Sequence, residues 1–233
     1  MNPLFARQGV FIMILLLMMI FTGGFTIEKL AFGLPAVLIA ITLHEFAHAF
    51  IADKLGDPTP RLQGRLSFDI RNHIDPVGIL LFLFVGFGWA KPVETDPRNL
   101  KNPRKAMALI AAAGPIMNIL IGIITIIIAV KLGSGIDVKI LKLFQYIIGY
   151  NISFAVFNFI PIPPLDGSKI IALFMSPKTY YKYQEFEYRY QFQLMMGLMF
   201  VVFVFPGVLG KLINFFGGPI ESVGITIANL LPF

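Results

Sequence analysis

The chain is built from long apolar runs separated by shorter polar and charged segments. A helix that crosses a membrane needs about 20 apolar residues, because the hydrocarbon layer is roughly 30 Å thick. Runs near this length predict about six transmembrane helices, at residues 9–27, 31–52, 106–130, 141–160, 191–205 and 207–232. The pattern therefore predicts an all-α polytopic membrane protein.

A further apolar run at residues 77–90 is shorter than a membrane span. As a helix it would measure about 21 Å, which is less than the thickness of the hydrocarbon layer. We predict that it forms a re-entrant or interfacial segment, which returns to the side of the membrane that it left. This prediction decides which side every later segment faces.

Residues 65–71 read Arg-Leu-Ser-Phe-Asp-Ile-Arg and alternate between polar and apolar side chains. A period of two is typical of a β-strand with one buried face. We therefore predict a small β element between the second span and the re-entrant segment.

The basic residues predict the orientation of the chain. If residues 77–90 are re-entrant, 14 of the 19 Lys and Arg residues lie on the same side as the N-terminus. Lys and Arg are enriched in cytoplasmic loops. We therefore predict an integral protein of the cell membrane, with its N-terminus and its β element on the cytoplasmic side.

Composition excludes several classes of protein. Hydrophobic residues make up 57% of the chain and charged residues 14%, whereas soluble domains contain about 25% charged residues. The net charge of +6 is accounted for by the basic loops, so we expect no nucleic-acid partner. Because the chain has no cysteine, any bound metal must be held by His, Asp or Glu.

The second apolar run contains the pattern His44-Glu45-Phe46-Ala47-His48. Residues four apart share one face of a helix, so both imidazoles can bind one metal ion, and Glu45 lies beside them to handle a proton. Ionisable residues inside a span are costly and are typical of functional sites. This favours a metal site over polar side chains that are merely hydrogen-bonded within the helix bundle.

A catalytic zinc ion usually has three protein ligands, and the third is either His73 or a carboxylate. The best carboxylate is Asp166, which follows the fourth predicted span after Pro161, Pro163 and Pro164. These prolines end the helix, and irregular backbone at membrane depth is tolerated where it is buried or lines a cavity. Asp166 and the two histidines meet on one side of the membrane only if residues 77–90 do not cross it.

These motifs resemble those of the site-2 protease family of intramembrane zinc metalloproteases. The resemblance covers nearly the whole chain and rests on His44-Glu-Phe-Ala-His48, Asn158-Phe-Ile-Pro-Ile-Pro-Pro-Leu-Asp-Gly167, Gly64-Arg-Leu66, His73-Ile-Asp-Pro76, Gly88-Trp-Ala-Lys-Pro92, Asn102-Pro-Arg-Lys105 and Ala113-Gly-Pro-Ile-Met-Asn118.

The resemblance implies a single membrane protease domain over residues 1–233 with a core of six helices. It implies one Zn²⁺ per chain, bound at His44, His48 and Asp166, and a general base at Glu45. It also implies hydrolysis of peptide bonds within or near the transmembrane segments of membrane-anchored proteins or peptides in the lipid bilayer. Larger family members carry PDZ-like or nucleotide-binding domains, for which this chain has no room.

Several alternatives stay open. Asn118 and Asn158 either donate to the oxyanion that develops on a peptide carbonyl or hold helices together. His, Asp and Glu inside a membrane also build proton and ion pathways, so a transporter is the main competing function, followed by an inactive scaffold of the same fold. Against a transporter, the polar residues gather at one end of two helices. The sequence does not indicate the substrate or an oligomeric state.

Overall fold

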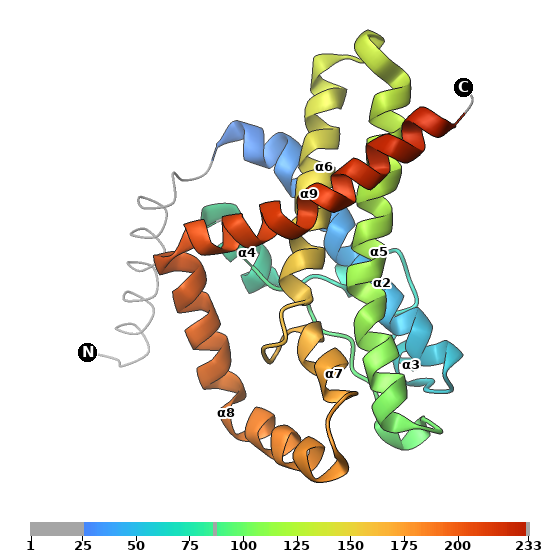
Figure 1. Cartoon of the computed structure of the whole chain (residues 1–233), viewed down its shortest axis with the longest axis vertical. Helices are drawn as coiled ribbons and strands as arrows, with labels where there is room; N and C mark the ends of the chain where they lie inside the picture. The colour runs from blue at the N-terminus through green and yellow to red at the C-terminus, as the bar shows by residue number, and fades with distance from the viewer. Residues whose placement is uncertain (1–25, 86–87, 232–233) are drawn as a thin grey trace.

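The computed structural model describes residues 26–85 and 88–231 of the chain, so the predicted span at 9–27 lies almost wholly outside the described residues. The described part is helical (Figure 1). Its elements are η1 (Lys29–Gly33), α2 (Leu34–Lys54), α3 (Thr59–Leu62), η2 (Ile70–Asn72), α4 (Pro76–Val85), η3 (Pro97–Asn99), α5 (Pro103–Leu132), η4 (Gly133–Gly135), α6 (Val138–Asn158), α7 (Asp166–Ala172), α8 (Pro177–Val204) and α9 (Pro206–Leu230).

Helices α2, α5 and α6 form the core and confirm the predicted helices at 31–52, 106–130 and 141–160. Each is long and apolar enough to cross a membrane, η1 extending α2 to Lys29–Lys54. Small residues let the helices approach closely: Gly122 of α5, for example, packs against Ile152 of α6. On the outer face of α5, Leu120 and Ile124 are about half exposed, which suits contact with lipid. The chain is therefore an integral membrane protein.

The segment around α4 contains the predicted re-entrant segment, residues 77–90. Ile74, just before α4, forms an isolated antiparallel β-bridge with Ala90, which follows it. The Lys91 N–H donates to the carbonyl oxygen of His73 at 3.0 Å. Gly78 allows this return, because a Cβ atom there would overlap the backbone of Trp89. Both ends of the segment therefore lie side by side.

The prediction of a strand at 65–71 was wrong. These residues form bends and the start of η2, and within 26–85 and 88–231 the isolated bridge is the only β pairing. The alternation reflects local contacts instead of two faces of a sheet. Arg65 is buried and donates to backbone carbonyls, and Asp69 caps η2 by accepting the Arg71 N–H at 3.0 Å.

The three prolines after α6 break the helix as predicted, and α7 then begins at Asp166. Gly167 is required here because a Cβ atom would overlap the carbonyl oxygens of Phe159 and Ile160. At the other end of α7, the Arg104 guanidinium from α5 donates to the carbonyl oxygens of Ala172 at 3.0 Å and Leu173 at 2.6 Å. Helix α7 is therefore held against α5.

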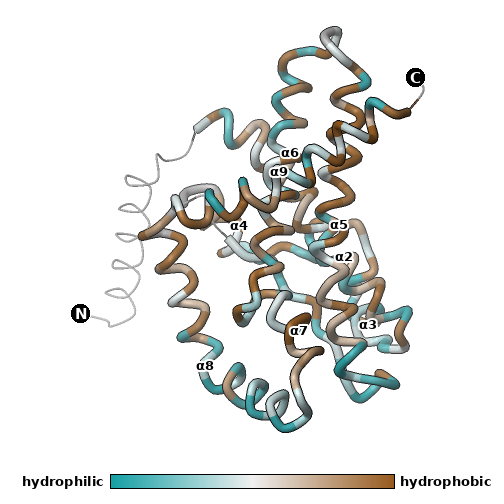
Figure 2. The backbone as a smooth tube through the Cα atoms, viewed as in Figure 1, coloured by the Kyte–Doolittle hydropathy of each residue, from teal (hydrophilic) through white to brown (hydrophobic). Residues whose placement is uncertain are grey.

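The last two predicted spans, 191–205 and 207–232, fall in α8 and α9. The pair bends by 88° at its junction, where Pro206 begins α9 and Phe205 leaves the helical conformation, as a residue before proline tends to do. The described residues thus contain three candidate spans, or four if this pair counts as one. Figure 1 shows α9 crossing α5 and α6, and Figure 2 shows hydrophilic residues around α3 and along the first half of α8.

Candidate metal centre

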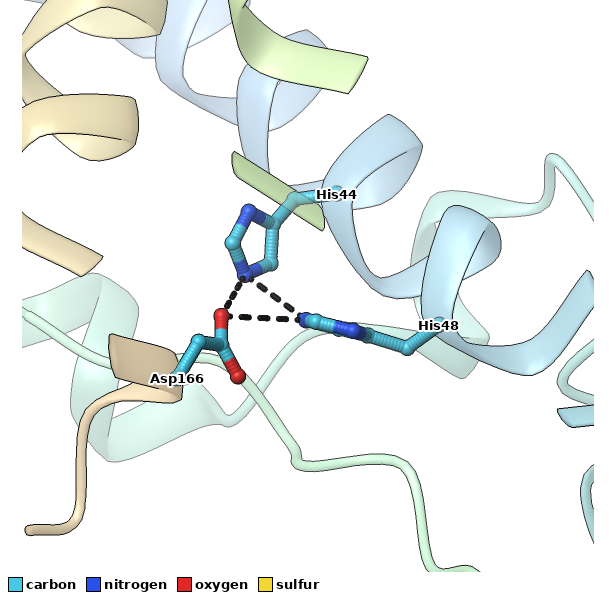
Figure 3. Close-up of side chains that lie close together, drawn as sticks. All are labelled: His44, His48 and Asp166. Atoms are coloured by element: carbon cyan, nitrogen blue, oxygen red, sulfur yellow. Dashed lines mark hydrogen bonds and ion pairs between the residues drawn. The ribbon is translucent and has the colours of Figure 1, made fainter. Parts of the chain in front are cut away.

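Two histidines of α2 and the first residue of α7 converge on one point (Figure 3). Asp166 Oδ2 lies 3.2 Å from His44 Nε2 and 3.3 Å from His48 Nε2, and the two Nε2 atoms are 3.0 Å apart. Both histidines are 8% exposed, which places the cluster inside the protein. The sequence predicted these three residues as one site, and the fold brings them together.

The hydrogen bonds of the two imidazoles indicate that Nδ1 of each ring carries a hydrogen. His44 Nδ1 lies 2.6 Å from the side-chain oxygen of Asn118, and His48 Nδ1 lies 2.7 Å from the carbonyl oxygen of Ile110. The Asn118 amide orientation is set because its nitrogen donates to Ala40 O at 3.1 Å and Asn151 Oδ1 at 2.9 Å. Both partners of the Nδ1 atoms are thus acceptors, so each Nδ1 carries a proton, and in the neutral imidazole each Nε2 presents a lone pair.

Two imidazole nitrogens and one carboxylate oxygen therefore face one another. Asp166 Oδ2 is buried and accepts no hydrogen bond from the described residues. Two imidazole lone pairs and a carboxylate oxygen at this distance repel one another unless a cation lies between them. Two nitrogens and one oxygen, each histidine being held by a hydrogen bond on its other nitrogen, fit the ligand set of a zinc ion.

Gly114 of α5 makes the room for the two imidazoles. A Cβ atom at this position would overlap Nε2 of His48 and the ring of His44. Sequence reasoning named Gly114 only as part of a resemblance. Gly114 is distinguished by its lack of a side chain, and the need for this can be seen only when α2 and α5 are packed together.

Glu45 lies next to the cluster on α2. Its Oε2 atom accepts the Val93 N–H at 3.2 Å and is 3.7 Å from Nη2 of Arg65. Glu45 and His44 both line two cavities. A carboxylate held beside the metal ligands and open to a cavity can take up and release a proton.

The two cavities meet at the cluster. The larger, of about 400 Å³, is mostly apolar and reaches from His44 and Glu45 to side chains of α4, α6, α8 and α9, among them Phe82, Tyr150, Phe154, Met199 and Leu209. The smaller, of about 160 Å³, is more polar and is lined by all three cluster residues together with Thr95 and Lys169. The cluster is therefore accessible from an apolar and from a polar side.

The other predicted residues lie in different surroundings. Asn158 lines both cavities, and its amide donates to Phe154 O at 3.1 Å. Asn118 is fully buried, with its amide nitrogen engaged by Ala40 and Asn151. The His73 ring is 2.6 Å from the carbonyl oxygen of Ser67, and among the described residues it does not join the cluster. These contacts favour an orienting role for Asn118 and a structural role for His73.

Comparison with known proteins points to one family. The model of peptidase family M50 matches residues 32–136 and 126–202, which include all four residues His44, Glu45, His48 and Asp166. The proposed zinc metalloprotease YwhC of Bacillus subtilis (strain 168) is 36% identical over 152 residues, which are 60% of this chain and 68% of the relative. The proposed zinc metalloprotease Rip2 of Mycobacterium tuberculosis is 26% identical over 170 residues, 67% of this chain and 64% of the relative. No solved structure matches the chain.

Proposed function

We propose a catalytic mechanism for this chain from the premise that it belongs to peptidase family M50 and is a membrane zinc metalloprotease. The observation that carries the mechanism is the convergence of two imidazole nitrogens and one buried carboxylate oxygen at His44, His48 and Asp166. Neither the family nor the named relatives favour a transporter.

His44, His48 and Asp166 hold one zinc ion per chain in this mechanism. When bound, zinc supplies a Lewis acid that makes water more acidic and polarises a peptide carbonyl. The side-chain oxygen of Asn118 and the carbonyl oxygen of Ile110 accept hydrogen bonds from the two Nδ1–H groups. These hydrogen bonds would keep both Nε2 atoms directed at the ion. The three residues thus direct two nitrogens and one oxygen at one point.

Glu45 acts as the general base. Its carboxylate takes a proton from the attacking water and returns it to the amine of the leaving peptide. The Val93 N–H holds one of its oxygens, which fixes the carboxylate beside the metal ligands. Asn158, which lines both cavities, is the candidate donor to the oxyanion of the peptide carbonyl.

The substrate is a membrane-anchored protein or peptide cut within or near its transmembrane segment. A helical segment must unwind locally, because its peptide groups are sealed by their own hydrogen bonds. The apolar cavity of about 400 Å³ suits the side chains of such a segment. Residues 89–93, which follow α4, offer a backbone edge with which the extended substrate can pair, and the β-bridge at Ala90 supports this step.

We further propose that residues 1–233 form a single protease domain with six spans in the cell membrane. Its N-terminus and its metal centre lie on the cytoplasmic side. The excess of Lys and Arg on the side of the N-terminus supports this orientation, and so does the re-entrant course of the α4 segment.

The mechanism is tested with Glu45→Gln, which preserves the shape of the side chain but cannot accept the proton. We expect about one zinc ion per chain in both proteins. Membrane proteins that co-purify with the variant are identified by mass spectrometry, and purified wild-type protein is expected to cleave them in liposomes. Cleavage by the variant at the wild-type rate, with zinc still bound, would refute the role of Glu45. Absence of zinc from His44→Ala and Asp166→Ala is the matching test of the ligands.

A further inference from the structure

A buried arginine lies beside the proposed base. Arg65 is 2% exposed, and its Nη2 atom is 3.7 Å from Glu45 Oε2. A buried cation needs both charge compensation and hydrogen-bond acceptors. Glu45 is the carboxylate that compensates the charge of Arg65 at close range. The mechanism above gives Arg65 no role.

The turn before Arg65 directs it inward. Gly64 has a φ of +71°, a left-handed conformation that favours glycine, and the Arg65 N–H donates to Pro60 O at 2.8 Å. The chain therefore turns back after α3, and the guanidinium reaches under the re-entrant segment. This explains why glycine precedes arginine here, although the pattern alone predicted a strand.

The Arg65 guanidinium joins the two ends of the re-entrant segment. Its Nη1 donates to the carbonyl oxygen of Asn72, before α4, and its Nη2 to that of Lys91, after α4. The backbone between these ends contributes the Lys91 N–H bond to His73 O and one isolated bridge. The planar fork of an arginine can bind both carbonyls at once, which a single ammonium group cannot do with the same geometry.

The segment that follows α4 also holds Glu45. Two residues after Lys91, the Val93 N–H donates to Glu45 Oε2. A closed ring of contacts therefore joins Arg65, Lys91, Val93 and Glu45. The guanidinium fixes residues 91–93, and these residues and the guanidinium together fix the carboxylate.

We propose that Arg65 is the positioning residue of the catalytic base: one guanidinium joins both ends of the re-entrant segment and places the Glu45 carboxylate beside the metal ligands. The proposal rests on the function proposed above. It assigns to the Gly64-Arg65 turn a contribution to the chemical step in addition to its contribution to the fold.

The test compares Arg65→Ala and Arg65→Lys with wild type, using as substrate a membrane protein trapped by Glu45→Gln, in liposomes. For Arg65→Ala we expect kcat to fall about 100-fold, since misplacing a reacting group by about 1 Å has an effect of that order. KM and zinc content stay close to wild type, because neither the apolar cavity nor the metal ligands change. Added guanidinium should restore part of kcat and saturate, whereas methylammonium at equal ionic strength should not.

Arg65→Lys keeps the charge but not the fork, and we expect kcat to be about 10-fold below wild type with zinc retained. Arg71→Ala is the matched control, because Arg71 belongs to the same loop, is 88% exposed and pairs with Asp69. It should cleave like wild type. If wild type is active and Glu45→Gln is not, the proposed function stands independently of Arg65.

Three results would overturn the proposal. The first is wild-type kcat in Arg65→Lys. The second is a loss of activity in Arg65→Ala that guanidinium does not restore while zinc is retained. The third is loss of zinc from both Arg65 variants, which would make the residue a purely structural support. Should Arg65→Ala alone fail to fold, the Arg65→Lys result decides.

Discussion

At the scale of single residues, the metal centre depends on side chains that never touch the metal. The side-chain oxygen of Asn118 accepts a hydrogen bond from His44 Nδ1–H at 2.6 Å. The Asn118 amide is itself oriented by its hydrogen bonds to Ala40 and Asn151. A chain of amides from α6 through α5 to α2 thus decides which imidazole nitrogen presents its lone pair. Such outer partners typically change metal affinity by about 10- to 100-fold when removed.

We therefore predict that Asn118→Ala binds zinc about 10- to 100-fold more weakly than wild type. Without its acceptor, the His44 ring can rotate or move its proton to Nε2. Competition with a chelator of known affinity measures the change. Thr125→Val is the control, because Thr125 is buried on the same helix and its hydroxyl donates to Ile121 O. Equal zinc affinities in Asn118→Ala and wild type would contradict the orienting role.

At the scale of elements, the site depends on how closely α5 approaches α2. Alanine is favoured over glycine inside a helix by about 1 kcal/mol, so Gly114 is costly unless its lack of a side chain is needed. Glycine is needed at this position, because a Cβ atom would overlap both imidazoles. Helix propensity and metal binding therefore oppose each other at this position, and the metal centre requires glycine.

Gly114→Ala is accordingly expected to lower zinc occupancy strongly and to lower the melting temperature measured in detergent. Gly149→Ala on α6 offers the comparison, because no atom lies within 4 Å of a Cβ atom built there. It should leave zinc content unchanged and raise helix stability slightly, in line with propensity. A Gly114→Ala protein with full zinc occupancy would show that α5 can move away from α2 at little cost.

At the scale of the whole molecule, the side on which each segment lies determines whether the site can form. His44 and His48 belong to α2, and Asp166 follows α6. In the proposed topology the two meet because the segment around α4 returns to its origin, so that only α5 and α6 cross between them. A crossing at residues 77–90 would have placed Asp166 on the opposite side from the histidines.

The topology predicts the labelling of introduced cysteines, which is simple because the chain has none. Arg71→Cys, before the re-entrant segment, and Lys101→Cys, after it, should both react with a membrane-impermeant thiol reagent only from the cytoplasmic side. Lys139→Cys, between α5 and α6, should react only from the other side. Reaction of Arg71→Cys and Lys101→Cys from opposite sides would mean that residues 77–90 cross the membrane.

Much of this protein could be predicted from sequence because a bilayer leaves few choices. Apolar length predicted the helices α2, α5 and α6, and the proline cluster after α6 predicted the break before Asp166. The short run at 77–90 predicted a re-entrant segment, and the bridge between Ile74 and Ala90 supports this prediction. The spacing of His44 and His48 predicted the metal site, since one helix face is enough to bring two imidazoles together.

Only the tertiary structure decided the contacts between segments distant in sequence. Local alternation at 65–71 suggested a strand, but the Arg65 side chain donates its hydrogen bonds to the carbonyl oxygens of residues 72 and 91. The room left by Gly114 and the orientation of the Asn118 amide likewise depend on partners far along the chain. The periodicity of a segment indicates which of its faces is buried on average. The position of a buried polar group depends instead on its individual hydrogen-bond partners. The sequence alone therefore determined which atoms could bind the metal, and the packing of α2, α5 and α7 decided which of them face one another and what holds them there.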